Sequence, residues 1–264
     1  MNRVVLPALA ATTGTWLVTA LGAAVVVFFK NPRQRFLDIL LGFAAGVMIA
    51  ASFWSLLQPA IDMAAGRLLP PWFVVTAGFL LGAAFMYLSD KAVDFALRRV
   101  SKAESGIGHN KRILLLVLSI TLHNIPEGLA VGLAFGALHS NYSAETLMAA
   151  CTLALGIGLQ NFPEGAAVSL PLRREGLSRR KCFLLGQASG MVEPLAGLAG
   201  ALALVYISKI LPFALAFAAG AMILVAVHEL IPECQSCREA SPYSATLGIV
   251  FGFSLMMLLD VALG

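Results

Sequence analysis

Long apolar runs alternate with short polar or Pro/Gly-rich breaks along the chain. Each run is long enough for the helix of about 20 residues that crosses the roughly 30 Å hydrocarbon core of a bilayer. The first run exceeds the apolar core of a signal peptide, which has about 7–15 residues, so we interpret it as a membrane span. The pattern predicts one all-α transmembrane domain over residues 1–264, with eight helices at about 4–29, 37–58, 72–90, 113–138, 144–172, 182–206, 211–232 and 243–262.

Composition supports a membrane protein and excludes other classes. Hydrophobic residues occupy 59% of the 264 positions and charged residues only 12%, whereas soluble domains carry about 25% charged residues. A soluble fold of this size could not bury so much apolar surface. No basic stretch is interleaved with aromatic residues, so we expect no nucleic-acid partner. The four scattered cysteines do not form a disulfide framework.

Lysines and arginines predict the orientation of the chain in the membrane. Fifteen of the 18 lie in the loops that follow the first, third, fifth and seventh predicted helices, and the other three lie on the opposite side. Since cytoplasmic loops carry the excess of Lys and Arg, both termini are expected outside the cytoplasm. We interpret the chain as a multi-pass protein of the inner or plasma membrane.

Two pairs of predicted helices repeat one another in sequence. Phe43–Ile49 of the second matches Phe217–Ile223 of the seventh, and residues 76–90 of the third match residues 246–260 of the eighth. The charge pattern predicts that the two copies of the repeat cross the membrane in opposite directions. The predicted arrangement is therefore an inverted repeat of three, two and three helices (3+2+3). Inverted repeats around a site at mid-membrane are typical of alternating-access transporters.

Three predicted helices near the centre of the chain carry polar residues within apolar runs. The fourth contains His123-Asn-Ile-Pro-Glu-Gly128, the fifth Gln160-Asn-Phe-Pro-Glu-Gly165 and the sixth Glu193-Pro194. Counted from the basic residues at about 1.5 Å per residue, these groups lie about 14–18 Å deep, near the middle of the bilayer. A carboxylate there costs about 2.5–3.5 kcal/mol, and no intramembrane Lys or Arg pairs with the three glutamates. Protons or a bound cation must therefore neutralise them.

The spacing of these residues favours a bound metal. His123 and Glu127, like Gln160 and Glu164, lie four residues apart and so project from one face of a helix. The prolines of all three motifs are expected to open each helix beside its ligands and to free backbone carbonyls. Imidazole, carboxylate and amide groups, with the thioether of Met48, suit a borderline metal such as Zn²⁺ or Fe²⁺ better than Ca²⁺. The alternative is a hydrogen-bonded core of neutral glutamic acids.

The three motifs closely resemble those of the ZIP (Zrt/Irt-like) divalent-metal transporters. The likeness extends over the whole chain to its closing Leu-Asp-Val-Ala-Leu-Gly264, and it is greatest to prokaryotic members with a two-metal site. By this resemblance, the ligands of the transported metal would be Met48, His123, Glu127, Gln160 and Glu164. A neighbouring second site would use Asn124 and Glu193, with Glu127 and Glu164 as bridges.

The resemblance also implies a path on either side of this site. The outer entrance would be lined by Ser55, Asp62 and Asp260, and the inner exit by Asp90, His228 and Glu229. The chain departs from the family in two places. Asn161, at the second site, stands where members that bind two metals often have Asp, which removes a charge. The loop between the third and fourth helices is often His-rich in the family, and here offers only His109.

We therefore expect a transporter rather than an enzyme, which carries a divalent transition metal into the cytoplasm: Zn²⁺ is the leading candidate, with Fe²⁺, Mn²⁺ and Cd²⁺ as alternatives. No cofactor is expected beyond one or two bound ions of the transported metal. The expected partners are the metal ions and the lipid bilayer, and a homodimer is left open. A metal-selective channel with the same site is the alternative to alternating access.

Two further motifs give weaker signals. His228-Glu-Leu-Ile-Pro232 resembles the HExxH of zinc proteases, but Pro232 stands where the second histidine is needed, which disfavours an intramembrane metalloprotease. Cys234-Gln-Ser-Cys237 is a single CxxC in a predicted cytoplasmic loop, where a structural disulfide is not expected. Free thiols and a weak metal-acceptor site are both open there.

Overall fold

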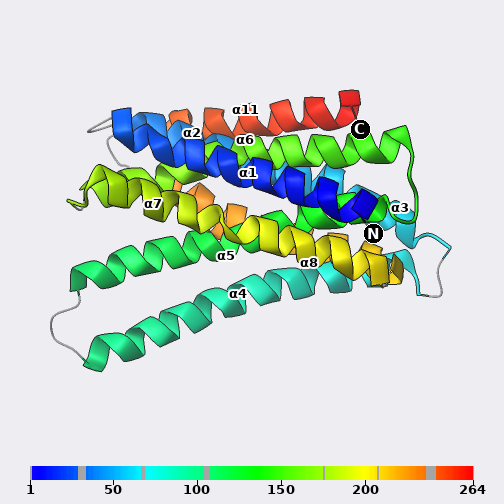
Figure 1. Ribbon diagram of the computed structural model, residues 1–264, viewed down its shortest axis with the longest axis horizontal. Coiled ribbons are helices and arrows are strands. Elements are labelled where there is room, and N and C mark those ends of the chain that lie inside the picture. Colours follow the sequence, from blue (N-terminus) through cyan, green and yellow to red (C-terminus); the bar gives the residue numbers. More distant parts are fainter. Residues whose placement is uncertain are drawn as a thin grey trace.

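A computed structural model describes residues 2–28, 34–66, 69–103, 108–174, 176–206, 208–235 and 242–263. These residues are almost entirely helical and contain no strand. The long helices run roughly along one common direction (Figure 1). In chain order the elements are α1 (Asn2–Phe28), α2 (Gln34–Ala51), η1 (Ser52–Leu57), α3 (Gln58–Ala64), α4 (Pro71–Ala103), α5 (Gly108–Ala137), α6 (Ala144–Arg174), α7 (Arg179–Gly190), α8 (Val192–Tyr206), η2 (Ser208–Ile210), α9 (Leu211–Val225), η3 (Ala226–Leu230), α10 (Ile231–Cys234) and α11 (Pro242–Leu263).

Six helical stretches among these described residues are long and apolar enough to cross a membrane. They comprise α1, α2 with α3, α4, α7 with α8, α9 with α10, and α11. The expectation of an all-α, multi-pass membrane protein is confirmed. Helices α5 and α6 have 30 and 31 residues and are not among the six. These two helices carry the polar motifs of the central predicted spans.

Two short π-helical segments interrupt apolar helices. Segment η1 follows α2 and η3 follows α9, and each leads into a helix whose first turn contains a proline, Pro59 or Pro232. A proline has no N–H with which to continue the α-helical ladder, so the backbone pairing changes before it. Segments of this kind are frequent at functional sites. Here they carry Ser55 and Glu229, which the sequence assigned to the entrance and the exit.

The prolines of the two central motifs do not interrupt their helices. Helix α5 continues through Pro126 and α6 through Pro163, so neither helix is broken there, although each proline leaves the carbonyl four residues before it without its helical donor. A proline removes a single N–H, and the packing of the rest of a long helix maintains it. The third motif does lie at a break, because α7 ends at Gly190 and α8 begins at Val192, two residues before Pro194.

Glycines let pairs of helices approach to backbone contact. Where α2 meets α11, a Cβ on Gly46 would lie 2.0 Å from the carbonyl oxygen of Ile249. Where α9 meets α4, a Cβ on Gly220 would lie 1.9 Å from the carbonyl oxygen of Phe79. Both distances are far inside van der Waals contact, so each crossing requires glycine. The two contacts are equivalent in the sequence repeat, in which Gly46 corresponds to Gly220 and Phe79 corresponds to Ile249.

Within each of these pairs, one helix is much more buried than the other. In the apolar stretches, 67% of positions are buried in α2 with α3 and 61% in α9 with α10, against 22% in α4 and 17% in α11. Helices α4 and α11 therefore form outer faces, which expose large side chains such as Leu81, Phe85 and Phe251. This is the arrangement that lipid-facing helices need.

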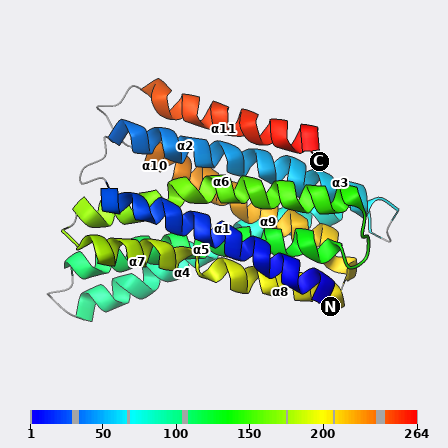
Figure 2. The ribbon, with the colours of Figure 1, turned by 45° about the horizontal axis from the view of Figure 1, so that its top comes forward.

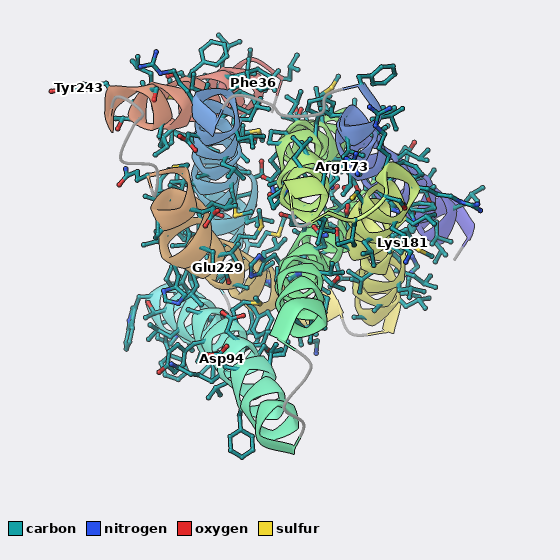
Figure 3. The ribbon with its side chains drawn as sticks, turned by 90° about the vertical axis from the view of Figure 1, so that its left-hand side faces the viewer. Phe36, Asp94, Arg173, Lys181, Glu229 and Tyr243 are labelled. Atoms are coloured by element: carbon teal, nitrogen blue, oxygen red, sulfur yellow. The ribbon has the colours of Figure 1, made fainter. Side chains whose placement is uncertain are left out.

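The two chain termini and the connection between α6 and α7 lie at opposite ends of the helix bundle. Both chain termini lie at one end (Figures 1 and 2). Helix α6 ends and α7 begins at the opposite end, where Arg173 and Lys181 lie (Figure 3). The basic residues Arg173 and Lys181 thus lie at the end of the bundle away from both termini.

Candidate metal site

The residues that the sequence assigned to the metal lie buried in the bundle. They belong to α2, α5, α6 and α8, and are Met48, His123, Asn124, Glu127, Gln160, Asn161, Glu164 and Glu193. None exposes more than 4% of its surface. Helices α5 and α6 pack against each other, and α5 packs against α8. Three separate helices thus deliver polar groups to one interior.

Several oxygens of this site lack hydrogen-bond partners. Gln160 Nε2 donates to Glu127 Oε1 at 2.6 Å, which leaves Glu127 Oε2 and Gln160 Oε1 buried and unpaired. Both carboxylate oxygens of Glu164 are also buried and unpaired. A buried polar group without a partner costs about 1–3 kcal/mol, and more if it is charged. Carboxylate and amide oxygens are ligands that suit a divalent cation.

The carboxylates are close enough to influence one another. Glu127 interacts electrostatically with Glu164 and Glu193, and Glu164 with Glu193 and Glu229. Charges of one sign repel strongly in a protein interior, because the dielectric constant is low. A divalent cation among them would replace this repulsion with attraction. The fit between site and metal therefore rests on charge as well as on unpaired oxygens.

The predicted second group of ligands is hydrogen-bonded within the protein. Asn161 Nδ2 donates to both carboxylate oxygens of Glu193 at 2.9 Å. Asn124 Nδ2 donates to the backbone carbonyl of Ser189 at 2.8 Å, near the end of α7. The amide nitrogens of both asparagines are therefore engaged, whereas the Oδ1 atom of each is buried without a hydrogen-bond partner, like the oxygens of Glu164.

Two threonines of α1 join this group, and the sequence reasoning missed them. Thr15 Oγ1 lies 2.5 Å from Glu193 Oε2, and Thr19 Oγ1 lies 3.2 Å from Glu193 Oε1. Both threonine side chains are buried. A signal was present, because Thr12, Thr15 and Thr19 fall on one face of an otherwise apolar helix. That spacing alone does not indicate which partner the hydroxyls meet.

His123 lies against residues of the predicted exit. Its Nε2 is 2.5 Å from Glu229 Oε1, and with Asp90 these residues place one ligand atom each within 4.8 Å of one another. The three come from α5, η3 and α4, and Figure 3 labels Glu229 among those segments. The side chain of His228 is exposed and is not part of this group. The structure thus joins a predicted midplane ligand to two of the three predicted exit residues.

On the other side of the site, Ser55 and Asp260 meet. Ser55 Oγ donates to Asp260 Oδ1 at 2.5 Å, which connects η1 with α11. Asp260 Oδ2 is buried and has no hydrogen-bond partner. Asp62 is exposed and accepts a hydrogen bond from Gln58 Nε2 at 3.1 Å. The structure brings together two of the three predicted entrance residues and leaves the third at the surface.

In the described part of the chain, the cysteine motif contributes no ligand to the candidate metal site. Cys234 is buried, and its Sγ lies 3.2 Å from the carbonyl oxygen of Ile231. Cys237 lies outside the described residues, as does the side chain of His109. Both readings of the CxxC motif stay predictions.

A protein-family model matches the part of the chain that contains all three polar motifs. The model is that of the ZIP zinc transporters, and it matches residues 98–260. This match covers more than half of the 264 residues.

Named relatives match almost the whole chain. It is 42% identical to zinc transporter ZIP11 of Homo sapiens, over 98% of each chain. It is 39% identical to zinc transporter ZIPB of Bordetella bronchiseptica, over 93% of this chain and 78% of the relative. It is 38% identical to zinc transporter GufA of Myxococcus xanthus, over 93% and 94%. The expected likeness to bacterial members is present, and the likeness to a vertebrate member is slightly greater.

Proposed function

This chain belongs to the ZIP family of zinc transporters, and we propose that it carries Zn²⁺ across the membrane into the cytoplasm by way of Glu127 and Glu164. The relatives are named as transporters and not as enzymes, in agreement with the expectation from the sequence. The side chains of Gln160, Met48 and His123 surround the proposed ion.

The unpaired oxygens of three buried side chains support this proposal most directly. Glu127 Oε2, Gln160 Oε1 and both oxygens of Glu164 have no hydrogen-bond partner in the protein. Zn²⁺ binds nitrogen, oxygen and sulfur ligands, usually four of them. Two carboxylates also balance the charge of one Zn²⁺. Since all these ligands belong to one chain, the proposed site does not need a second copy.

The proposed topology has eight membrane spans, α5 and α6 in addition to the six apolar stretches. At about 1.5 Å per residue, helices of 30 and 31 residues are about 45 Å long, enough to cross a bilayer. The basic loops, at the end where Arg173 and Lys181 lie, face the cytoplasm. Both chain termini then face the opposite side.

The packing of the helices supports alternating access. One group contains the pairs α2 with α11 and α4 with α9, and a second contains α1 with α6 and α5 with α8. Gly46 against Ile249 and Gly220 against Phe79 give the first group two matching contacts, as an inverted repeat requires. Most proposed ligands lie on α5 and α6, in the second group. A movement of one group against the other would open the site first to one side and then to the other.

The charges define a path for the ion after the midplane. Glu164 interacts electrostatically with Glu229, which lies beside Asp90 and His123. A cation that leaves Glu164 toward the cytoplasm therefore meets two further carboxylates and an imidazole. On the outer side, the ion would meet Ser55 and Asp260 before it reaches the site.

Uptake into proteoliposomes tests the proposal. Vesicles that contain the protein and a zinc-sensitive dye should accumulate Zn²⁺, and the double variant Glu127→Gln/Glu164→Gln should not. Glu145→Gln, an exposed carboxylate at the start of α6, is the matched control and should transport normally. A well-folded double variant that takes up Zn²⁺ at the wild-type rate would refute the proposed site.

A further inference from the structure

Glu193 has hydrogen-bond partners on both carboxylate oxygens. Its Oε2 lies 2.5 Å from Thr15 Oγ1, and its Oε1 lies 3.2 Å from Thr19 Oγ1. Asn161 Nδ2 lies 2.9 Å from each of the two oxygens. Glu164, in the same interior, has no hydrogen-bond partner on either oxygen. The two carboxylates are therefore in opposite situations, one surrounded by donors and the other open to an ion.

The amide of Asn161 can face Glu193 in one orientation only. Its Nδ2 is also 3.2 Å from the backbone carbonyl oxygen of Thr15, so three acceptor oxygens surround this nitrogen. If the amide were turned over, its oxygen would face these three acceptors and would repel all of them. Asn161 therefore presents a donor to Glu193, and its Oδ1, which is buried without a partner, is not the atom that faces Glu193. A cation between Asn161 and Glu193 would need an oxygen in place of this donor.

From this geometry we infer that Thr15, Thr19 and Asn161 take the place of a second cation at Glu193, and that the chain holds one Zn²⁺ at a time on the neighbouring carboxylates. The inference rests on the proposed function, because it takes those carboxylates as the ion's ligands. The two threonines are positioning residues, which hold Glu193 from α1 just after the break between α7 and α8.

Charge and the hydrogen bonds of Glu193 together lead to the same number of ions. Glu127, Glu164 and Glu193 carry at most three negative charges, so two Zn²⁺ would leave one net positive charge on this group and one Zn²⁺ would leave one net negative charge in a low-dielectric interior. One Zn²⁺ balances Glu127 and Glu164. The carboxylate of Glu193 then depends on its hydrogen bonds, and bonds to a charged acceptor are the strong ones. In Asn161→Asp, the added carboxylate would supply the missing charge.

The number of ions bound per chain tests this inference. The purified intact chain, equilibrated with Zn²⁺ and separated from free ion, should retain one Zn²⁺ per chain by elemental mass spectrometry. Asn161→Asp should retain two, because it removes a donor from Glu193 and adds a carboxylate beside it. Glu193→Gln should leave the wild-type number at one and return the number in Asn161→Asp from two to one.

A second measurement distinguishes the contribution of the threonine hydroxyl groups to stability from the contribution of side-chain packing. Thr15→Val/Thr19→Val keeps the shape of both side chains and removes the hydroxyls, whereas Thr15→Ser/Thr19→Ser keeps the hydroxyls and removes a methyl from each. We expect the Val pair to lower the unfolding temperature of the metal-free protein more than the Ser pair does. Thr12→Val is the control, since the hydroxyl of Thr12 is near backbone carbonyls of its own helix and does not contact Glu193. The reverse order of the Val and Ser pairs would show that packing alone matters.

The results distinguish this inference from the proposed function. Two ions in the wild type, falling to one in Glu193→Gln, would overturn the inference and leave the transport proposal intact. One ion in Asn161→Asp would also overturn it, because the donors would then not be what excludes the second ion. A wild-type chain that retains no Zn²⁺ would overturn both.

Discussion

His123 Nε2 lies 2.5 Å from Glu229 Oε1, and this contact connects α5 with the π-helical segment η3. His123 is one helical turn from Glu127, while Glu229 lies beside Asp90 of α4. The imidazole therefore lies between Glu127 on its own helix and the carboxylates of Asp90 and Glu229. A neutral imidazole in this place can bind a metal through one ring nitrogen while the N–H of the other donates to a carboxylate.

Replacing Glu229 with Gln should slow transport more than it weakens binding. Loss of a group that orients a metal-binding histidine costs about 10–100-fold in affinity or activity. We expect the uptake rate to fall by this amount, with a smaller change in the Kd for Zn²⁺, because Glu127 and Glu164 remain. Glu233→Gln, an exposed carboxylate one turn later, is the control and should leave the uptake rate unchanged. Parallel uptake and calorimetric measurements would show the difference, and an equal loss in both variants would contradict the role of Glu229.

Zn²⁺ binding should tighten with rising pH and release protons. Protons and the metal compete for the same carboxylate and imidazole groups, so the affinity should increase from about pH 5 to about pH 7.5. Titration calorimetry in two buffers with different ionisation enthalpies would count the protons released. A Kd that is constant over this range would mean that the ligands of the empty site are already deprotonated.

Alternating access predicts opposite accessibility on the two sides of the site. Cysteines introduced by Ser55→Cys and Glu229→Cys, each in a background without the native cysteines, should react with an impermeant thiol reagent in opposite conformations. The effect of Zn²⁺ on this balance is limited by its difference in affinity for the two states. Reagent applied from each side of the membrane would report the change. If both positions react together under every condition, the path is continuous and the protein is a channel.

Close contact between α4 and α9 predicts a large effect of a single methyl group. In Gly82→Ala the new Cβ would lie 1.9 Å from the carbonyl oxygen of Phe217. Overpacking of this kind costs about 1–3 kcal/mol or more, so the unfolding temperature should fall. In Gly14→Ala nothing lies within 4 Å of the new Cβ, and helix propensity should stabilise the protein by up to about 1 kcal/mol. Thermal unfolding in one detergent would compare them, and equal temperatures would argue against the close crossing.

The sequence by itself determined the class of the protein and supplied the candidate residues of its proposed metal site. Hydropathy is a local property, so the apolar runs revealed membrane helices before any contact was known. The four-residue spacing of Gln160 and Glu164 likewise placed their side chains on one face of α6, because helix geometry is regular. Family membership followed from the same motifs, and the family match confirmed it.

Only the tertiary structure decided which polar groups meet. The resemblance already placed Asn161 of α6 and Glu193 of α8 at one site, but nothing in the sequence of α1 indicated that Thr15 meets them. Likewise His123 meets Glu229 across two helical segments distant in the chain. Such contacts depend on how the helices are rotated and shifted against one another. That register is set by packing across the whole bundle, where glycine crossings hold backbones together, and no local pattern contains it.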